Sequence, residues 1–354
     1  MRRVQINLIV FMSLAVFCLA FTAPEAVSAQ TTANGVCVTS TANSVGGTWE
    51  SRAATLSHRA ETTSAVLDDK LYIAGGLAGP SNFFTGITTS FEVYDPILDQ
   101  WKELAPIPKP LHHAAIVGAN GHIYLTGGYT ALNFIANVTS AWAYDPQTNT
   151  WATIADLPGP RAAHTMAAIN SIIYLVGGIT SASTALWSYD PVADKWNTQH
   201  QPMPTGREHT TSAVVDGKLY VIGGEVPNPN GGGAETYMRL NTNEVYDPVA
   251  DQWKTLAPMP IPESDITSGI IDGKIHVASG ENNQDSCVFA QHEVYDPKTD
   301  QWSAMADMLT PRHGAVSGVI GGKWYLVDGA TKPGIPTIST LTNKVEVFTP
   351  GTTP

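Results

Sequence analysis

Three nearly identical decapeptides decide the fold: EVYDPILDQW at residues 92–101, EVYDPVADQW at 244–253 and EVYDPKTDQW at 293–302. In each of them the Trp stands six residues after the Asp of a Tyr-Asp-Pro triplet. The same spacing returns in looser copies that carry Tyr144 with Trp151 and Tyr189 with Trp196, and a degenerate copy is Phe348-Thr349-Pro350. A motif that recurs about every 50 residues with fixed internal spacing indicates a repeat architecture.

A glycine doublet precedes each of these motifs and closes an apolar segment, as in Leu71-Tyr72-Ile73-Ala74-Gly75-Gly76. The other doublets begin at Gly127, Gly177 and Gly223, with looser forms at Ser279-Gly280 and Asp328-Gly329. Tight-turn signals such as Asp216-Gly217 separate short apolar segments, which predicts hairpins. No window shows a helical period. Four strands in each of six units predict an all-β chain, a six-bladed β-propeller with four-stranded blades.

The last unit lacks its fourth strand, since the chain ends soon after Val345–Phe348. A matching segment stands at the other end, around Thr48-Trp49. We therefore expect the N-terminal strand to complete the C-terminal blade and to close the ring, because closure removes exposed strand edges.

The units resemble kelch repeats. The kelch pattern of a glycine doublet, Glu-Val-Tyr-Asp-Pro and a spaced Trp matches Gly75-Gly76, Glu92–Pro96 and Trp101, and again Gly223-Gly224, Glu244–Pro248 and Trp253. The resemblance runs from about Trp49 to Pro350. It implies the propeller fold, but it does not select an activity, because kelch propellers serve both as binding scaffolds and as enzymes.

The N-terminus has the form of a secretory signal. Arg2 and Arg3 precede an apolar run from Leu8 to Phe21, and Val27-Ser28-Ala29 is a small-x-small ending. We predict a signal peptide at 1–29, an N-terminal extension at 30–47, the propeller at 48–350 and a tail at 351–354. The expected location is secreted or periplasmic, with no integral membrane segment after cleavage. Outside the signal the cysteines are Cys37 and Cys287; they can pair in an exported chain, but sequence does not show that they meet.

Charge excludes one class of partner. Lys+Arg of 19 against Asp+Glu of 31 gives a formal charge of −12, which argues against nucleic acid because phosphate binding needs a basic surface. No cofactor motif and no zinc-like Cys/His spacing is present, so the histidines are interpreted as hydrogen-bonding groups, and neither a metal nor a cofactor is expected.

Candidate ligand-binding residues follow from a position 17 residues before the last glycine of each doublet. It is occupied by Arg59, Leu111, Arg161, Arg207, Glu263 and Arg312. Blade geometry places these residues on one face with the variable loops between the second and third strands, so that face is expected to be the working face. Either each Arg braces its own loop, or the four form a ring that binds an anion. His113 and Asp265, close in sequence to this position, complete the predicted site. The loops themselves carry Phe83, Phe84, Glu235, Tyr237 and residues 281–285.

Two functions remain open. The first is an exported binding module that recognises a protein segment or a glycan on this face. The alternative is an enzyme acting on an acidic sugar, similar to the periplasmic sialic acid mutarotases, in which Arg161, Arg207 and Arg312 hold the carboxylate and Glu263 or His209 moves protons. Galactose-oxidase-like copper chemistry lacks its constellation here, and a ubiquitin-ligase adaptor lacks its BTB-like region.

Overall fold

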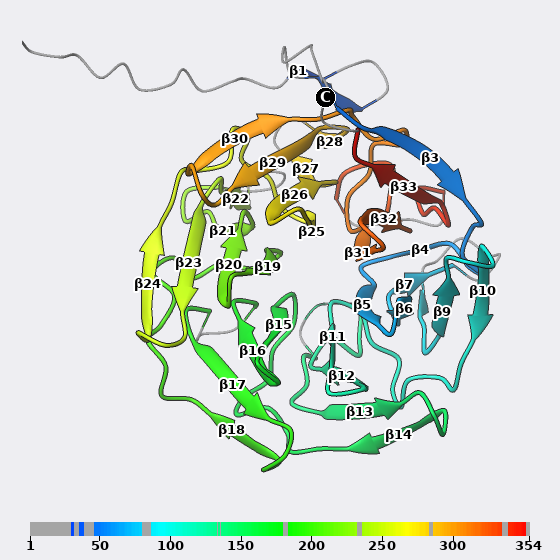
Figure 1. Cartoon of the computed structure of the whole chain (residues 1–354), viewed down its shortest axis with the longest axis vertical. Helices are drawn as coiled ribbons and strands as arrows, with labels where there is room; N and C mark the ends of the chain where they lie inside the picture. The colour runs from blue at the N-terminus through cyan, green and yellow to red at the C-terminus, as the bar shows by residue number, and fades with distance from the viewer. Residues whose placement is uncertain are drawn as a thin grey trace, which may run out of the picture.

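The computed structural model is a closed ring of six four-stranded antiparallel sheets around a central channel (Figure 1). It describes residues 30–31, 35–38, 46–79, 86–132, 134, 136–179, 183–231, 236–282, 286–334 and 339–351. Within these ranges the regular structure is entirely strand. None of the described segments is a helix that could span a membrane. The predicted six-bladed β-propeller is confirmed; the predicted signal at 1–29 lies outside the described residues.

The strands of each blade are given in order from the channel outward. The first contains β5 (Thr63–Leu67), β6 (Lys70–Ala74), β9 (Phe91–Asp95) and β10 (Gln100–Glu103). The second contains β11 (Ala115–Ala119), β12 (His122–Thr126), β13 (Ala141–Asp145) and β14 (Thr150–Thr153). The third contains β15 (Thr165–Ile169), β16 (Ile172–Val176), β17 (Leu186–Asp190) and β18 (Lys195–Asn197).

The other three blades follow the same plan. The fourth contains β19 (Thr211–Val215), β20 (Lys218–Ile222), β23 (Asn243–Asp247) and β24 (Gln252–Thr255). The fifth contains β25 (Thr267–Ile271), β26 (Lys274–Ala278), β29 (His292–Asp296) and β30 (Gln301–Ala304). The sixth contains β31 (Val316–Ile320), β32 (Lys323–Val327), β33 (Val345–Thr349) and β3 (Thr48–Arg52).

The N-terminal strand closes the ring, as predicted. Strand β3 pairs antiparallel with β33, with Thr48 opposite Thr349 and Arg52 opposite Val345. The Trp49 indole donates its Nε1–H to the carbonyl of Ala306 in the fifth blade, 2.7 Å away. The last blade is therefore built from both ends of the chain, which leaves its sheet without a missing strand.

The repeated tryptophans join neighbouring blades. In the first blade Trp101 donates to the carbonyl of Ala53 at 2.9 Å, and Asp99 accepts both the Ala53 N–H and the Tyr94 hydroxyl. The same indole-to-carbonyl bond recurs around the ring, from Trp151, Trp196, Trp253 and Trp302. The Tyr-Asp-Pro-x4-Trp motif thus fastens the outer edge of each blade to the blade before it.

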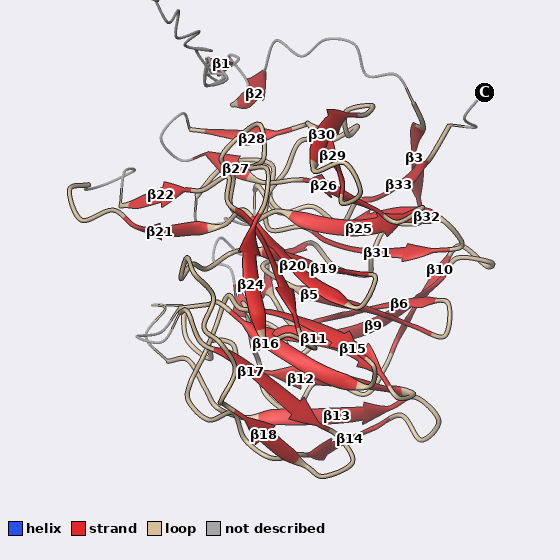
Figure 2. Ribbon diagram, turned by 60° about the vertical axis from the view of Figure 1, so that its left-hand side comes forward, coloured by secondary structure: helices blue, strands red, loops and turns tan. Residues whose placement is uncertain are grey.

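Shorter strands extend the face that carries the loops between second and third strands. They are β4 (Arg59–Ala60), β7 (Leu77–Ala78) and β8 (Gly86–Ile87) in one sheet, and β21 (Glu225–Pro227) with β22 (Tyr237–Arg239) in another. A third small sheet joins β1 (Gln30–Thr31) and β2 (Val36–Val38) to β28 (Cys287–Phe289) and β27 (Glu281–Asn282). Figure 2 shows β21, β22, β27 and β28 projecting on the same side of the propeller.

The small sheet that contains β2 and β28 settles the cysteine question that sequence left open. Strand β2 runs parallel to β28, with Cys37 opposite Phe289. A disulfide joins Cys37 to Cys287, whose Cα atoms are 5.2 Å apart across a separation of 250 residues. Both cysteines are buried against Ile261 and Phe289. The N-terminal extension is therefore tied covalently to the fifth blade.

Candidate functional site

A closed circle of backbone hydrogen bonds surrounds one mouth of the channel. In every blade, the residue two positions before the innermost strand has a left-handed backbone, with φ between 51° and 57°. Each of these residues donates its N–H to the carbonyl of its counterpart in the preceding blade, at 2.8–3.3 Å. We call this circle the mouth ring; it consists of Glu61, His113, Ala163, His209, Asp265 and Gly314.

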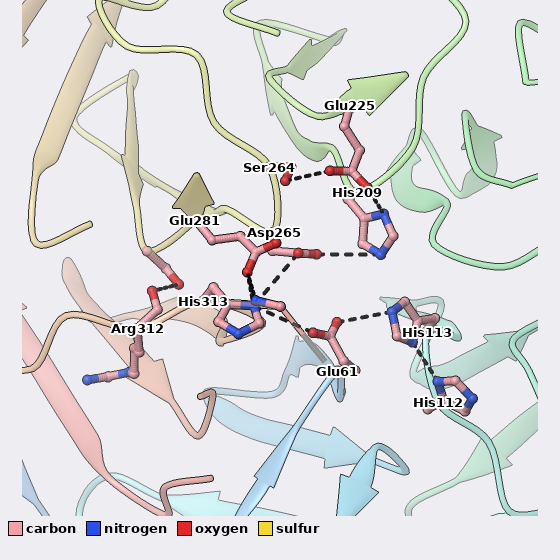
Figure 3. Close-up of polar contacts among 12 residues, drawn as sticks. Glu61, His112, His113, His209, Glu225, Ser264, Asp265, Glu281, Arg312 and His313 are labelled. Carbon is pink, nitrogen blue, oxygen red and sulfur yellow. Dashed lines mark hydrogen bonds and ion pairs between the residues drawn. The ribbon is translucent and has the colours of Figure 1, made fainter. Parts of the chain in front are cut away.

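Four members of the mouth ring carry ionisable side chains, and these side chains converge (Figure 3). Nε2 of His113 lies 3.4 Å from Oε2 of Glu61, and Nε2 of His209 lies 3.6 Å from Oδ1 of Asp265. His313, the residue before Gly314, adds a third imidazole. Its Nδ1 lies 3.8 Å from Glu61 Oε1, 3.8 Å from Asp265 Oδ2 and 3.4 Å from Glu281 Oε2.

A cavity of about 340 Å³ opens above this cluster. We call it the mouth cavity. Its walls include Tyr129, Phe134, Tyr237 and Arg239 as well as the ionisable members of the mouth ring. Below the ring, hydroxyl groups such as those of Ser212, Ser268 and Ser317 line the channel, in a second space of about 210 Å³. The mouth ring therefore forms the floor of the mouth cavity.

Outer residues hold the side chains of the floor. The Arg239 guanidinium bridges Glu225 Oε2 at 3.1 Å and Glu281 Oε1 at 2.8 Å. Ser264 Oγ donates to Glu225 Oε2 at 2.9 Å, and the Gly334 N–H donates to Glu281 Oε2 at 2.6 Å. Glu225 in turn lies 3.5 Å from Nδ1 of His209.

Burial and nearby charges shift the pKa values of these groups in different directions. Burial and the nearby Asp265 carboxylate raise the pKa of Glu61 to about 8. Burial lowers the pKa of His209, but Asp265, Glu225 and Glu208 outweigh it and bring that pKa to about 10. Burial opposes ionisation of Asp265 as well, yet the adjacent His209 and His313 hold its pKa below the ordinary value. The floor therefore mixes anionic, cationic and neutral groups within a few ångströms.

His113 differs from the other two imidazoles. Burial, followed by the neighbouring His209 and His112, lowers the pKa of His113 well below its ordinary value. A neutral imidazole of this kind keeps one bare ring nitrogen.

Several buried polar atoms around the mouth cavity have no hydrogen-bond partner among the described residues. They are the hydroxyl of Tyr129, Oε2 of Glu208, Nε of Arg239, Nδ1 of His209 and both ring nitrogens of His313. Buried polar groups are nearly always satisfied, so their concentration around one cavity points to a polar ligand there.

Of the two interpretations of the arginines, the anion-binding ring at the mouth is wrong, and each Arg instead lies within its own blade. Arg59, Arg161, Arg207 and Arg312 are buried to within 1% exposure inside their own blades. The reason is a partner two residues before the Tyr of the Tyr-Asp-Pro motif. Arg59 pairs with Glu92 at 2.8 Å, Arg207 with Glu244 at 2.5 Å and Arg312 with Glu346 at 2.9 Å. Arg161 instead stacks over the Trp187 ring, 3.8 Å from its centroid.

Glu263 also lies inside a blade rather than at the mouth. It is buried, and burial together with the adjacent carboxylate of Glu293 raises its pKa well above the ordinary value. Glu263 and Glu293 occupy the two positions that hold an Arg–Glu pair in other blades. Because two adjacent buried carboxylates repel each other, we infer that they share a proton. Glu263 does not reach the mouth cavity, which corrects its candidacy as an acid–base group there.

Three predicted residues do meet: His113, His209 and Asp265 all belong to the mouth ring. Glu281 and Tyr237, on the predicted loops, also line the mouth cavity, whereas sequence reasoning missed Glu61, Glu225 and Tyr129. A sequence signal for Glu61 was available, because every mouth-ring residue stands two positions after the arginine position, and Glu61 stands two positions after Arg59. Of the predicted loop residues, Phe83, Phe84, Glu235 and Asp285 lie outside the described residues.

Two groups of side chains at the floor could hold a metal ion, although no metal was expected from sequence spacing. Glu61, His113 and His209 form one group whose ligand atoms lie within 4.8 Å of one another, and Glu61, Asp265 and His313 form a second. The residues of the two groups come from five separate blades, so no local sequence motif contains them.

Comparison with known proteins gives consistent matches. The model of the KLHDC2/KLHL20/DRC7 Kelch-repeats domain matches residues 27–178 and 152–329. Kelch repeat and BTB domain-containing protein 12 of Danio rerio is 28% identical over 65% of this chain and 31% of its own length. Kelch-like protein terF of Aspergillus terreus is 29% identical over 67% of this chain and 53% of its own length.

Among solved structures, YjhT superimposes with a TM-score of 0.67 at 18% identity, covering 85% of this chain and 99% of that one. This likeness concerns the fold alone. The chain spans between about a third and about half of the two curated relatives.

Proposed function

The chain belongs to the kelch-repeat family, and from this premise we propose that it is an exported interaction module that binds an uncharged glycan in the mouth cavity. The observation that carries the proposal is the composition of that cavity. At about 340 Å³ it has the size of small-ligand sites. Its wall combines the aromatic rings of Tyr129, Phe134 and Tyr237 with several unpartnered buried polar atoms.

Those two kinds of surface match the two kinds of surface on a sugar. Aromatic rings cover the C–H faces of a pyranose, while carboxylates and a guanidinium exchange hydrogen bonds with its hydroxyls. The Tyr129 hydroxyl is buried and has no partner among the described residues, and Phe134 packs edge-on against Tyr129 with ring centroids 5.6 Å apart. Tyr129 therefore offers a fixed aromatic surface that ends in a free hydroxyl.

The charges around the cavity favour a neutral ligand over an acidic one. The four arginines that suggested an anion are paired within their blades. Arg239 reaches the cavity, but its guanidinium contacts both Glu225 and Glu281. Of the residues assigned to an acidic-sugar mutarotase, the cavity contains His209 alone. The binding module is therefore the better supported of the two initial hypotheses.

Export is the second component of the proposal. The disulfide between Cys37 and Cys287 supports it, because disulfides form and persist mainly in oxidising compartments. The charged start and the small-x-small ending before Gln30 are its sequence support.

The test is a glycan array followed by isothermal titration. The full chain is exported by a bacterial host and purified without a tag. We expect binding of uncharged glycans, weakened about fivefold to tenfold by Tyr129→Phe, since a hydrogen bond contributes about 1 kcal/mol. Tyr72→Phe is the matched control, because Tyr72 lies in the core of the first blade.

Two results would overturn the proposal. One is capture of acidic glycans alone. The other is an array without signal while the chain, correctly folded by circular dichroism, binds peptides with an affinity that depends on Tyr129.

A further inference from the structure

We propose that the floor of the mouth cavity is a divalent transition-metal site, with Glu61, His113 and His209 as protein ligands and Asp265 and His313 beside them. The proposal goes beyond glycan binding and does not depend on it. It rests on the direction in which ring nitrogens point, on the spacing of the ligand atoms and on the outer residues that hold them.

The orientation of His113 follows from a chain of hydrogen bonds. Nε2 of His112 lies 3.1 Å from the carbonyl of Ala131, and a carbonyl can only accept, so Nε2 carries the proton. The other nitrogen of a neutral His112, Nδ1, is then an acceptor. It lies 2.6 Å from Nδ1 of His113, so His113 donates from Nδ1. Nε2 of His113 is consequently left with a lone pair.

That lone pair points at an oxygen that also carries lone pairs. Nε2 of His113 and Oε2 of Glu61 are 3.4 Å apart, and the two side chains are 6% and 9% exposed. Two such atoms face each other at this separation when a positive group lies near both of them, either a proton on Glu61, whose pKa is raised to about 8, or a cation that takes its place. A divalent cation meets that requirement.

His209 also has a carboxylate behind one ring nitrogen, but its Nε2 faces Asp265 as well, so a bound ion must take the place of the proton on Nε2. Its Nδ1 lies 3.5 Å from Glu225 Oε1, on the side away from the floor. A carboxylate at one ring nitrogen orients the other nitrogen toward a metal, which is the usual support for a histidine ligand. Glu225 is itself held by Ser264 and by Arg239. The rings of His113 and His209 meet edge to face with centroids 5.0 Å apart.

Spacing supports ligation over direct hydrogen bonding. The nitrogen–oxygen distances across the floor are 3.4 Å at His113–Glu61, 3.6 Å at His209–Asp265 and 3.8 Å at His313–Glu61. A charge-assisted hydrogen bond would be about 2.7–2.9 Å long. Donor atoms held 2.0–2.2 Å from one tetrahedral ion lie about 3.3–3.6 Å apart. The separations at His113–Glu61 and His209–Asp265 match the second value, and that at His313–Glu61 is slightly longer.

The backbone leaves room for this arrangement. A Cβ added at Gly314 would lie 2.5 Å from Oε1 of Glu61. Glycine at this one member of the mouth ring therefore gives space to the carboxylate of the next blade. His313, only 1% exposed at its side chain, brings its Nδ1 to within 3.8 Å of both Glu61 and Asp265.

Ligand chemistry selects the class of ion. Two imidazoles and a carboxylate favour Zn²⁺, Fe²⁺, Mn²⁺ or Ni²⁺, whereas Ca²⁺ and Mg²⁺ prefer oxygen ligands alone. We therefore expect transition ions to bind and Ca²⁺ to compete poorly.

The experiment uses the full chain, exported, purified without a histidine tag, stripped with a chelator and dialysed. Titration with ZnCl₂ and MnCl₂ by calorimetry, with metal content by plasma mass spectrometry, is expected to give one ion per chain. His113→Ala and Glu61→Gln should each weaken binding at least 100-fold. His112→Phe should weaken it about 10–100-fold through the loss of orientation. His276→Gln is the matched control, because His276 is equally buried but lies in the fifth blade.

A measurement on the wild-type chain avoids any dependence on how well the variants fold. Addition of Co²⁺ should produce visible d–d absorption bands typical of mixed nitrogen and oxygen ligation, and Zn²⁺ should abolish them. The proposal is wrong if the stripped wild-type chain takes up less than a tenth of an equivalent of every ion tested. It is equally wrong if folded His113→Ala and Glu61→Gln bind as tightly as the wild type.

Discussion

At the scale of single residues, the buried arginines are struts of the blades. Arg207 uses nearly every donor of its guanidinium: Nε bonds the carbonyl of Gly223, one terminal nitrogen bonds Thr205 and Glu244, and the other bonds Val221. These contacts join the loop before the innermost strand to the second and third strands of the same blade. Such a planar fork cannot be replaced by lysine without losing contacts.

We predict that Arg207→Met destabilises the fold by about 3–5 kcal/mol, because it leaves the Glu244 carboxylate buried without its cation. Guanidinium denaturation at pH 7 measures the change. The control is Lys218→Met, which removes the exposed ion pair with Asp247 in the same blade and should cost at most about 1 kcal/mol. Equal effects of the two substitutions would show that burial of the Arg207 pair has no special weight.

A second residue-scale prediction concerns His276, which stands where five other blades have Tyr. Burial lowers the pKa of His276 to about 4, and its Nδ1 lies 2.8 Å from Nε2 of His292. Between pH 6.5 and about 4, His276 binds a proton in the unfolded chain but stays neutral in the folded chain. Stability is therefore complete above pH 6.5 and falls as the pH drops, by about 1.4 kcal/mol per pH unit for one such group.

We expect His276→Gln to make the free energy of unfolding less steep by about 1 kcal/mol per pH unit between pH 6.5 and 5, since Gln keeps a hydrogen bond without titrating. Urea denaturation at several pH values gives the slope. His122→Gln, at a partly exposed position of β12, should leave the slope as it is. An unchanged slope in His276→Gln would contradict the assignment.

At the scale of elements, the glycine doublets set how closely neighbouring blades approach. Gly75 has a φ of +61°, and a Cβ there would lie 2.4 Å from the carbonyl oxygen of Leu111 in the loop that leads to the second blade. The Gly76 N–H donates to that same carbonyl at 2.7 Å. The doublet is therefore the place where the end of one second strand touches the adjacent blade.

Gly75→Ala is predicted to cost at least about 3 kcal/mol, because backbone strain of about 1 kcal/mol adds to a clash that only a shift of the blades relieves. Gly217→Ala separates the two terms. Gly217 has a φ of +72°, but a Cβ there meets nothing within 4 Å, so it should cost about 1 kcal/mol. Chemical denaturation of both variants compares them, and equal losses would mean that the contact with Leu111 is not limiting.

The same element explains what sequence could and could not predict. Periodic features such as Trp101 and Gly75 were identified correctly because their partners recur in every unit. The role of the arginines stayed open because a single repeat position says nothing about its partner, and the compensating Glu92 and Glu244 lie on another strand. The convergence of Glu61 with the predicted His113 and His209 could not be foreseen, because the three meet only after six blades close into a ring.

At the scale of the whole molecule, two features fasten the ends of the chain. Strand β3 completes the sixth blade by hydrogen bonds, while the Cys37–Cys287 disulfide ties the segment before β3 to the fifth blade. The disulfide adjoins β27, which begins at Glu281, a carboxylate of the mouth cavity. Ring closure and the geometry of the mouth are thus linked through the N-terminal extension.

We predict that the double variant Cys37→Ser/Cys287→Ser lowers the free energy of unfolding by about 2–4 kcal/mol, because a bridge over a long loop restricts the unfolded chain. Denaturation under oxidising conditions measures the loss, and the wild type in reducing agent should fall to the same value. Because β3 still pairs with β33, circular dichroism of the variant should remain that of a folded β protein. If the variant is as stable as the oxidised wild type, strand pairing alone closes the ring and the disulfide contributes nothing to it.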